Sequence, residues 1–121
     1  MPTVRTSSSA RSPEELESLF EDALMIRDRA TLATLFEAGS TLVAGDAQPA
    51  RGGEQSAARA LTAWDAEHPY LASPQRVLAA RDLALIVGEQ GINVVRRNQH
   101  GDWRYAIVWQ SAHSEREREP R

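Results

Sequence analysis

Two kinds of hydrophobic periodicity follow one another along this sequence, and their order is the strongest constraint on its fold. Apolar residues recur at helical spacing to about residue 68, whereas the later segments 75–80, 83–89, 92–98 and 102–111 have strand-like patterns. Turn-forming residues separate these segments at 81–82, 90–91 and 98–101. Helices followed by strands predict an α+β fold in which three N-terminal helices pack on one face of a curved antiparallel sheet.

The first helix has a clear start signal. Ser12 suits the N-cap, Pro13 suits the first helical position, and Glu15 completes a capping box. An apolar stripe then continues to about Arg27. Its members are Leu16, Leu19, Phe20, Ala23 and Leu24.

Two further helices and a short strand are expected before the sheet. Asp28 caps a second helix that buries Leu32, Leu35 and Phe36 and that Gly39 ends. A strand over 40–44 and a loop over 45–53 follow. The third helix, over about 54–68, stops at Pro69. One of its faces presents Ala57, Ala60, Leu61 and Trp64.

The length of 121 residues fits one domain of ordinary size. The polar residues 1–12 and the charged residues 114–121 are expected to be flexible tails around a single domain over 13–113. Neither a membrane-spanning stretch nor a secretory signal is visible, so we expect a cytoplasmic protein without a membrane partner.

The composition excludes several kinds of chemistry. Cysteine is absent, which excludes disulfides, thiolate nucleophiles and cysteine-bound metals. All 14 cationic residues are arginine, so lysine Schiff bases are excluded, and the net charge of -3 argues against a nucleic-acid partner. The spacing of His68, His100 and His113 matches no zinc signature. We therefore expect no metal and no cofactor.

Three segments together resemble the nuclear transport factor 2-like superfamily, which includes SnoaL-like polyketide cyclases, ketosteroid isomerases and limonene epoxide hydrolase. These segments are LFEDALMIRDRATLATLFEAGSTLV, ARGGEQSAARALTAW, and RVLAARDLALIV with HGDWRYAIVWQ. The resemblance covers about residues 14–112, and the last pair is also similar to a SnoaL-like subgroup of actinobacterial natural-product clusters. It implies a cone-shaped roll with a pocket between the helices and the concave face of the sheet.

The resemblance also allows a test of catalytic positions. Ketosteroid isomerases place a tyrosine, a base aspartate and a protonated aspartate in their pocket. Phe20, Ala44 and Asn93 stand at these three positions here. Relatives often have an aspartate in the last strand, where this chain has Val108. The resemblance therefore does not bring the isomerase's proton-transfer groups to this chain.

Three other residues are candidates for an acid or a base: Asp46, His68 and Glu89. Each also has a structural interpretation, because Asp46 suits a turn, His68 suits a helix C-terminus, and Glu89 lies beside a turn. Tyr70 and Arg51 are candidate donors at the rim of the pocket, or ordinary surface residues.

The last strand offers two opposite faces. Alignment with the isomerases turns Ala106, Val108 and Gln110 toward the pocket. The convex face then holds a row that suits a homodimer interface, made of Trp103, Tyr105, Ile107 and Trp109. The opposite orientation, with both tryptophans in the core, stays open because the sequence fixes strand register only weakly.

Two functions follow from this pattern. The first is a SnoaL-like protein that acts on a small apolar, polyketide-like metabolite, as an isomerase or cyclase. The second is a non-catalytic homodimeric ligand-binding or assembly module. An ionisable residue inside the pocket would favour the first, and a collapsed pocket the second. The expected ligand contacts are Phe20, Ala44, Trp64, Asn93, Ala106, Val108 and Gln110.

Overall fold

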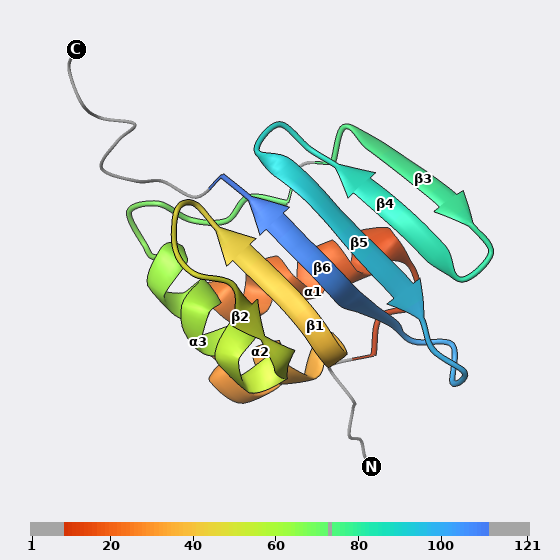
Figure 1. The fold of residues 1–121 in the computed structure, drawn as a ribbon, viewed down its shortest axis with the longest axis horizontal. Helices are drawn as coiled ribbons and strands as arrows, with labels where there is room; N and C mark the ends of the chain where they lie inside the picture. Colours follow the sequence, from red (N-terminus) through yellow and green to blue (C-terminus); the bar gives the residue numbers. More distant parts are fainter. Residues whose placement is uncertain (1–8, 73, 112–121) are drawn as a thin grey trace.

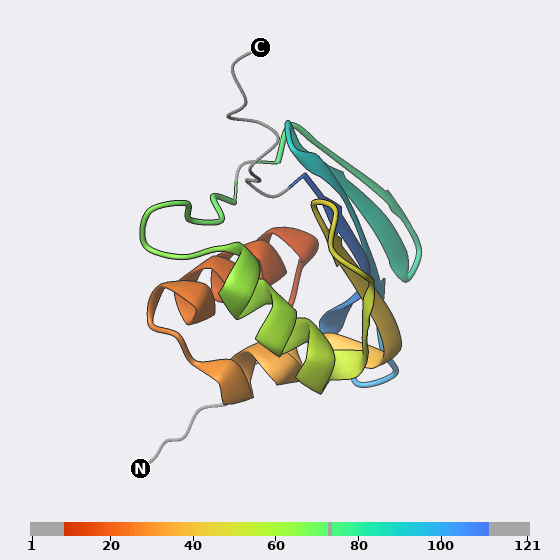
Figure 2. The same cartoon turned by 60° about the vertical axis from the view of Figure 1, so that its left-hand side comes forward.

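The computed structural model describes residues 9–72 and 74–111. Three helices cover one face of a six-stranded sheet, which confirms the predicted α+β architecture (Figure 1). From the side, the sheet forms a curved wall with the helices on its concave face (Figure 2). The strand order is β2-β1-β6-β5-β4-β3, so the sheet has β2 and β3 at its edges.

Helix α1 (Pro13–Met25) begins where the sequence predicts. The Ser12 hydroxyl accepts a hydrogen bond from the Glu15 N–H at 3.0 Å, and the Glu15 carboxylate accepts one from the Arg11 N–H at 2.7 Å. These reciprocal bonds satisfy N–H groups at the helix start. The buried face of α1 contains Pro13, Leu16, Glu17, Phe20, Ala23 and Leu24, so a carboxylate lies within the apolar stripe.

The N-terminal segment packs more closely than a flexible tail would. Ala10 is fully buried, and its carbonyl accepts a hydrogen bond from the Trp103 N–H at 3.0 Å. One small apolar residue beside Trp103 is enough for this contact. The polar composition of residues 1–12 as a whole does not reveal it. Residues 1–8 and 114–121 of the expected tails, and Ala112 and His113, lie outside the described residues.

Helix α2 (Arg29–Thr34) is capped by Asp28 as predicted, but β1 (Phe36–Ala44) begins earlier than the expected strand over 40–44. Gly39 does not end a helix. Its φ of 80° lies within β1, where the register of pairing shifts between Phe36 and Thr41. Glycine adopts a positive φ without strain at a helix end and at a strand irregularity alike, which explains the different position.

The next elements are β2 (Ala50–Arg51) and helix α3 (Gly52–Ala63). This helix ends before the predicted residue 68, so His68 does not lie on its apolar face. The Arg27 guanidinium donates to the carbonyl oxygens of Leu61 and Trp64 at 2.5 and 2.8 Å. These bonds satisfy carbonyl groups at the end of α3 and favour its termination there.

Four strands follow, β3 (Arg76–Ala80), β4 (Leu83–Val87), β5 (Gly91–Arg97) and β6 (Trp103–Gln110). They pair in sequence order and antiparallel, as predicted. One pairing differs from the expected antiparallel sheet, because β1 lies parallel to β6. Parallel neighbours need a long connection, and here α3 and the four strands β2, β3, β4 and β5 provide it.

A β-bulge divides β6 into two halves with opposite orientation. Val95 pairs with Tyr105 but Val94 pairs with Ile107, which leaves Ala106 as the extra residue. A bulge of this kind reverses which side chains face the core on either side of it.

The predicted row on the convex face is therefore wrong in its first half. Trp103 and Tyr105 are 5% and 0% exposed and face the helices, whereas Ile107 and Trp109 are 45% and 58% exposed on the outer face. The orientation with the aromatic row in the core applies to Trp103 and Tyr105, and the orientation with this row on the outer face applies to Ile107 and Trp109.

Candidate functional site

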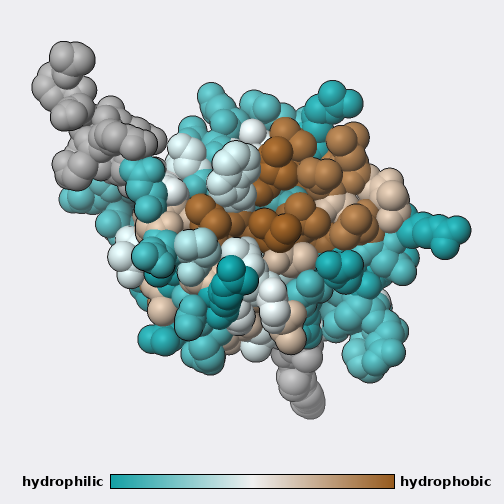
Figure 3. All heavy atoms as spheres, in the orientation of Figure 1, coloured by the Kyte–Doolittle hydropathy of each residue, from teal (hydrophilic) through white to brown (hydrophobic). Residues whose placement is uncertain are grey.

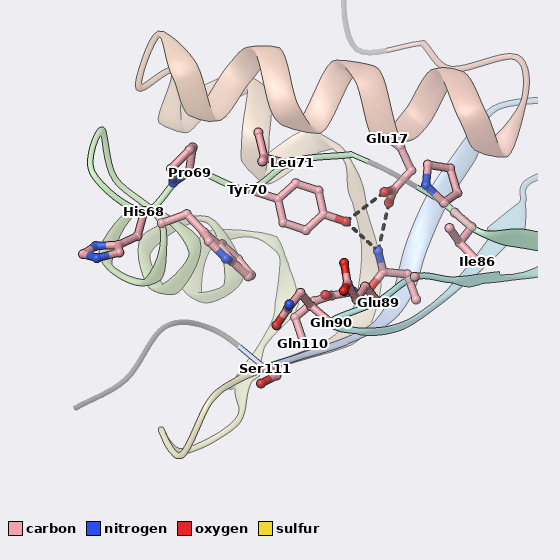
Figure 4. Close-up of a pocket in the computed structure, with 14 residues that line it drawn as sticks. Glu17, His68, Pro69, Tyr70, Leu71, Ile86, Glu89, Gln90, Gln110 and Ser111 are labelled. Atoms are coloured by element: carbon pink, nitrogen blue, oxygen red, sulfur yellow. Dashed lines mark hydrogen bonds between the residues drawn. The ribbon is translucent and has the colours of Figure 1, made fainter. Parts of the chain in front are cut away.

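A cavity of about 390 Å³ opens at one end of the cone (Figure 4). Its wall is formed by α1, the loop after α3, the turn between β4 and β5, and the end of β6. The volume lies within the range of roughly 300–1,000 Å³ that is usual for small-molecule sites. Lining residues include Glu17, Trp64, His68, Tyr70, Ile86, Glu89, Asn93 and Gln110.

Glu17 accepts three hydrogen bonds at the wall of this cavity. The Tyr70 hydroxyl donates to its Oε1 at 2.8 Å, and the Tyr105 hydroxyl and Asn93 amide donate to its Oε2 at 2.6 and 2.8 Å. Glu17 is 3% exposed, and no arginine of the described segments forms an ion pair with it. An ionised carboxylate only accepts hydrogen bonds, so the three donors suit its charged form.

Asn93 links this carboxylate to the opposite wall. Its second amide hydrogen is donated to the Tyr70 oxygen at 3.0 Å, and its carbonyl oxygen accepts a bond from the Gln110 amide at 2.9 Å. The network therefore extends from β6 through β5 to α1. Because each partner is buried or half-buried, these bonds hold the polar groups in fixed orientations.

Both tyrosines are hydrogen-bond donors and not acids. Burial raises the pKa of Tyr70 and Tyr105 far above the ordinary value of 10.0, and the nearby charge of Glu17 raises both further. The two phenols therefore keep their protons at neutral pH and direct them at Glu17.

An aromatic cluster behind the cavity fixes these rings. Phe20 contacts Tyr70, Tyr105 and Trp64 edge to face, with centroid separations of 4.9, 5.1 and 6.1 Å. Such contacts favour one arrangement of the rings in addition to burying their surface. The cluster is part of the buried core between the helices and the sheet.

The expected ligand contacts divide between the cavity and the buried interior. Trp64, Asn93 and Gln110 line the cavity. Four others are buried without lining it, namely Phe20, Ala44, Ala106 and Val108. The structure thus places only one of the three isomerase-equivalent positions, Asn93, at the cavity.

The candidate acids and bases lie at or beyond the mouth. Asp46 is exposed in the turn after β1 and does not line the cavity. Glu89 lines the mouth but is exposed, and the ring of His68 points away from Glu17 (Figure 4). His68 lies 3.5 Å from Asp65. Of the candidate rim donors, Tyr70 is buried in the network and Arg51 is exposed outside the cavity.

Sequence reasoning missed Glu17 and assigned Tyr105 to the wrong face. A signal for Glu17 was present, because it lies three residues before Phe20 and four after Pro13, at the spacing of the apolar stripe. A carboxylate at such a position needs buried donors from elsewhere in the chain. In the described residues, no group of histidine, aspartate and glutamate side chains suits a metal ion. None of the helices there is long and apolar enough to cross a membrane.

Comparison with protein-family models found no match, and neither did comparison with curated proteins. Solved structures do match. A protein of Thiobacillus denitrificans named as a calcium/calmodulin-dependent protein kinase type II association domain has a TM-score of 0.67 and 17% identity, over 88% of this chain and 98% of that chain.

Two further structures are similar. A ketosteroid isomerase-like protein of Erwinia carotovora atroseptica has a TM-score of 0.62 and 16% identity, over 83% of this chain and 93% of that one. An NTF-2 like protein of unknown function from Silicibacter pomeroyi has a TM-score of 0.60 and 18% identity, over 81% and 90% of the two chains. At these identities the likeness concerns the fold, and the fold implied by the sequence resemblance is confirmed.

Proposed function

We propose that this chain, which has the nuclear transport factor 2-like fold, binds a small molecule in the cavity beside Glu17. The main support is Glu17 itself, a carboxylate that is 3% exposed on a cavity wall. Burying an ionised group without a countercharge costs several kcal/mol, and such groups gather at functional sites. An ionisable residue inside the cavity favours a ligand site over a purely structural cone.

An isomerase-type reaction in this cavity would use Glu17 to exchange a proton with the ligand. Glu17 is the only charged residue that is buried in the described part of the chain. Tyr70 and Asn93 would orient its carboxylate through their hydrogen bonds. A polyketide-like substrate, the SnoaL-like subgroup and a cytoplasmic location stay predictions.

Two apolar residues provide a test of the binding site with its control. Trp64 lines the cavity, whereas Met25 is exposed on α1 away from it. Ligand-observed NMR with a library of small fragments should find binders whose affinity falls about tenfold or more in Trp64→Ala and stays within about twofold in Met25→Ala. Losing the buried Trp64 also costs about 3–5 kcal/mol of stability, so the folded fractions must be matched. Equal losses in both variants, or no binders, would contradict the proposal.

A second candidate function, assembly into a homodimer, is supported by an uncovered apolar area on the outer face of the sheet. We call this area the outer apolar face. It consists of Leu78, Leu83, Leu85, Val94, Ile107 and Trp109. Cross-strand pairing makes Leu78, Leu85, Val94 and Ile107 one continuous row over four strands. Figure 3 shows an apolar band on this face of the molecule, and Figure 1, in the same orientation, shows the helices behind the sheet.

A second copy of this chain is the occupant that we propose for the outer apolar face. A two-fold axis would set each row against the same surface of its partner, so both apolar surfaces would leave water together. The expected Trp103–Trp109 interface is thereby reduced to its Ile107 and Trp109 half, joined by residues of β3, β4 and β5.

Light scattering of Trp109→Arg tests this assembly. We expect the wild type to be a dimer and the variant a folded monomer, because two facing cations would have to lose their hydration. Met25→Arg is the control, since Met25 is 73% exposed and lies on α1. A monomeric wild type at micromolar concentration, or a variant that stays dimeric, would refute the interface.

A further inference from the structure

We infer that the polar group of the ligand is a protonated amine, an inference that rests on the proposed binding function. The first observation is the charge of the cavity. Glu17 and Glu89 line it, and the Glu21 carboxylate accepts a hydrogen bond at 3.3 Å from the N–H of Ala72, the residue after the lining residue Leu71. No arginine within residues 9–72 and 74–111 is among its lining residues. His68, the imidazole at the mouth, lies beside Asp65.

The second observation is the direction of the hydrogen bonds. The hydroxyl hydrogens of Tyr70 and Tyr105 point at Glu17, and both amide hydrogens of Asn93 are donated within the network. A ligand carbonyl or carboxylate would therefore meet no spare donor on these three residues. The polar wall around Glu17 presents an acceptor, so the ligand group that meets it has to be a donor.

Glu17 has an unused acceptor position for that donor. A carboxylate offers about four acceptor positions, and three of them are used here. Oε1 receives only the Tyr70 bond, whereas Oε2 receives two. An N–H of the ligand would therefore bind at Oε1. A neutral donor would complete the hydrogen bonds but leave the buried negative charge unpaired, whereas an ammonium group would do both.

The third observation is the aromatic wall next to this carboxylate. The rings of Trp64 and Tyr70 both line the cavity, with centroids 5.1 Å apart and planes at 74°. Cations are attracted to the faces of aromatic rings, most strongly to tryptophan. Two rings set nearly at right angles beside a carboxylate suit an alkylammonium group. Ile86 offers apolar contact for the remainder of the ligand.

Calorimetry with probes that share one rigid apolar body tests the inference. The probes are aminoadamantane, hydroxyadamantane, adamantane carboxylate and the N-acetylated amine, each titrated into the full chain near neutral pH. We expect the amine to bind about tenfold or more tightly than the alcohol, and the carboxylate not to bind. The acetylated amine keeps an N–H but has no charge, so it should bind no better than the alcohol.

Glu17→Gln should remove the preference for the amine over the alcohol, because glutamine has nearly the same shape without the charge. Glu14→Gln is the control, since Glu14 lies on the same helix but is exposed outside the cavity. Should Glu17→Gln fail to fold, the comparison of the amine with its acetylated form in the wild type decides the question.

The possible failures are distinguishable. Equal binding of amine and alcohol would overturn the amine inference and leave small-molecule binding intact. If no probe binds but the fragment library still yields binders that depend on Trp64, the amine inference is likewise overturned and small-molecule binding stays intact. If neither probes nor fragments bind, both the inference and the proposed function are overturned.

Discussion

Raising the pH above about 10 should destabilise this protein through its two tyrosines. The sequence makes the experiment unusually clean, because it contains neither lysine nor cysteine and its 14 cations are all arginine. Arginine keeps its proton throughout this range. Between about pH 9 and 11 the only side chains that titrate in the unfolded chain are therefore Tyr70 and Tyr105, which are the two tyrosines of the sequence.

The sign of the effect follows from burial. Burial and the charge of Glu17 raise the pKa of both phenols above the ordinary value of 10.0 in the folded state. The unfolded chain releases these protons near pH 10 and the folded chain does not, so the free energy of unfolding is unaffected below that pH and falls above it. Each phenol contributes about 1.4 kcal/mol per pH unit, which gives a loss of about 3 kcal/mol for the pair at about pH 11.

Urea denaturation at a series of pH values from about 8 to 11 measures this loss. Near pH 8, Tyr70→Phe and Tyr105→Phe should each be less stable than the wild type by about 1–3 kcal/mol, because Glu17 loses a donor. Between about pH 8 and 11, each variant should lose only half as much stability as the wild type, because it retains one tyrosine. A double variant with the full pH dependence, or tyrosinate absorbance that rises before unfolding, would refute the reasoning.

Two further variants test the packing. Gly91→Ala should cost about 1–3 kcal/mol in urea denaturation, because the added Cβ would overlap the Trp109 carbonyl oxygen across the β5–β6 pair, and an unchanged midpoint would show that β5 shifts freely. Arg27→Ala should cost about 1–3 kcal/mol through its lost bond to the Trp64 carbonyl and its other bond at the end of α3. Arg29→Ala should cost less than about 0.5 kcal/mol, since the ion pair of Arg29 is exposed, so equal losses in the two arginine variants would rule out the proposed role of Arg27.

The parts of the fold that could be predicted from the sequence have local signals. Ser12 and Pro13 define the start of α1 by chemistry that lies within a few residues. The four strands predicted after Pro74 are likewise confirmed. They could be predicted because turn residues separate the segments of alternating pattern. These signals do not depend on what the rest of the chain does.

The parts that could not be predicted depend on distant partners. Gly39 has the same backbone preference at a helix end and within β1, and only the pairing with β6 distinguishes the two. Ala106 becomes a bulge because of its register against β5, and nothing in the alternation of β6 marks it. Glu17 is a site residue only because Tyr70 and Asn93 reach it from 53 and 76 positions away.

The position of β6 between β1 and β5 has a consequence for how the chain folds as it is synthesised. Among the described strands, β1 pairs only with β6 and with the two-residue β2, yet β6 is translated last. Until β6 has been synthesised, the helices have no complete sheet to cover, and Phe20 of α1 lacks its partner Tyr105. Pairing that spans so much of the chain is slow to form. Arrival of the last strand should therefore convert a loose nascent chain into the native domain in one cooperative step.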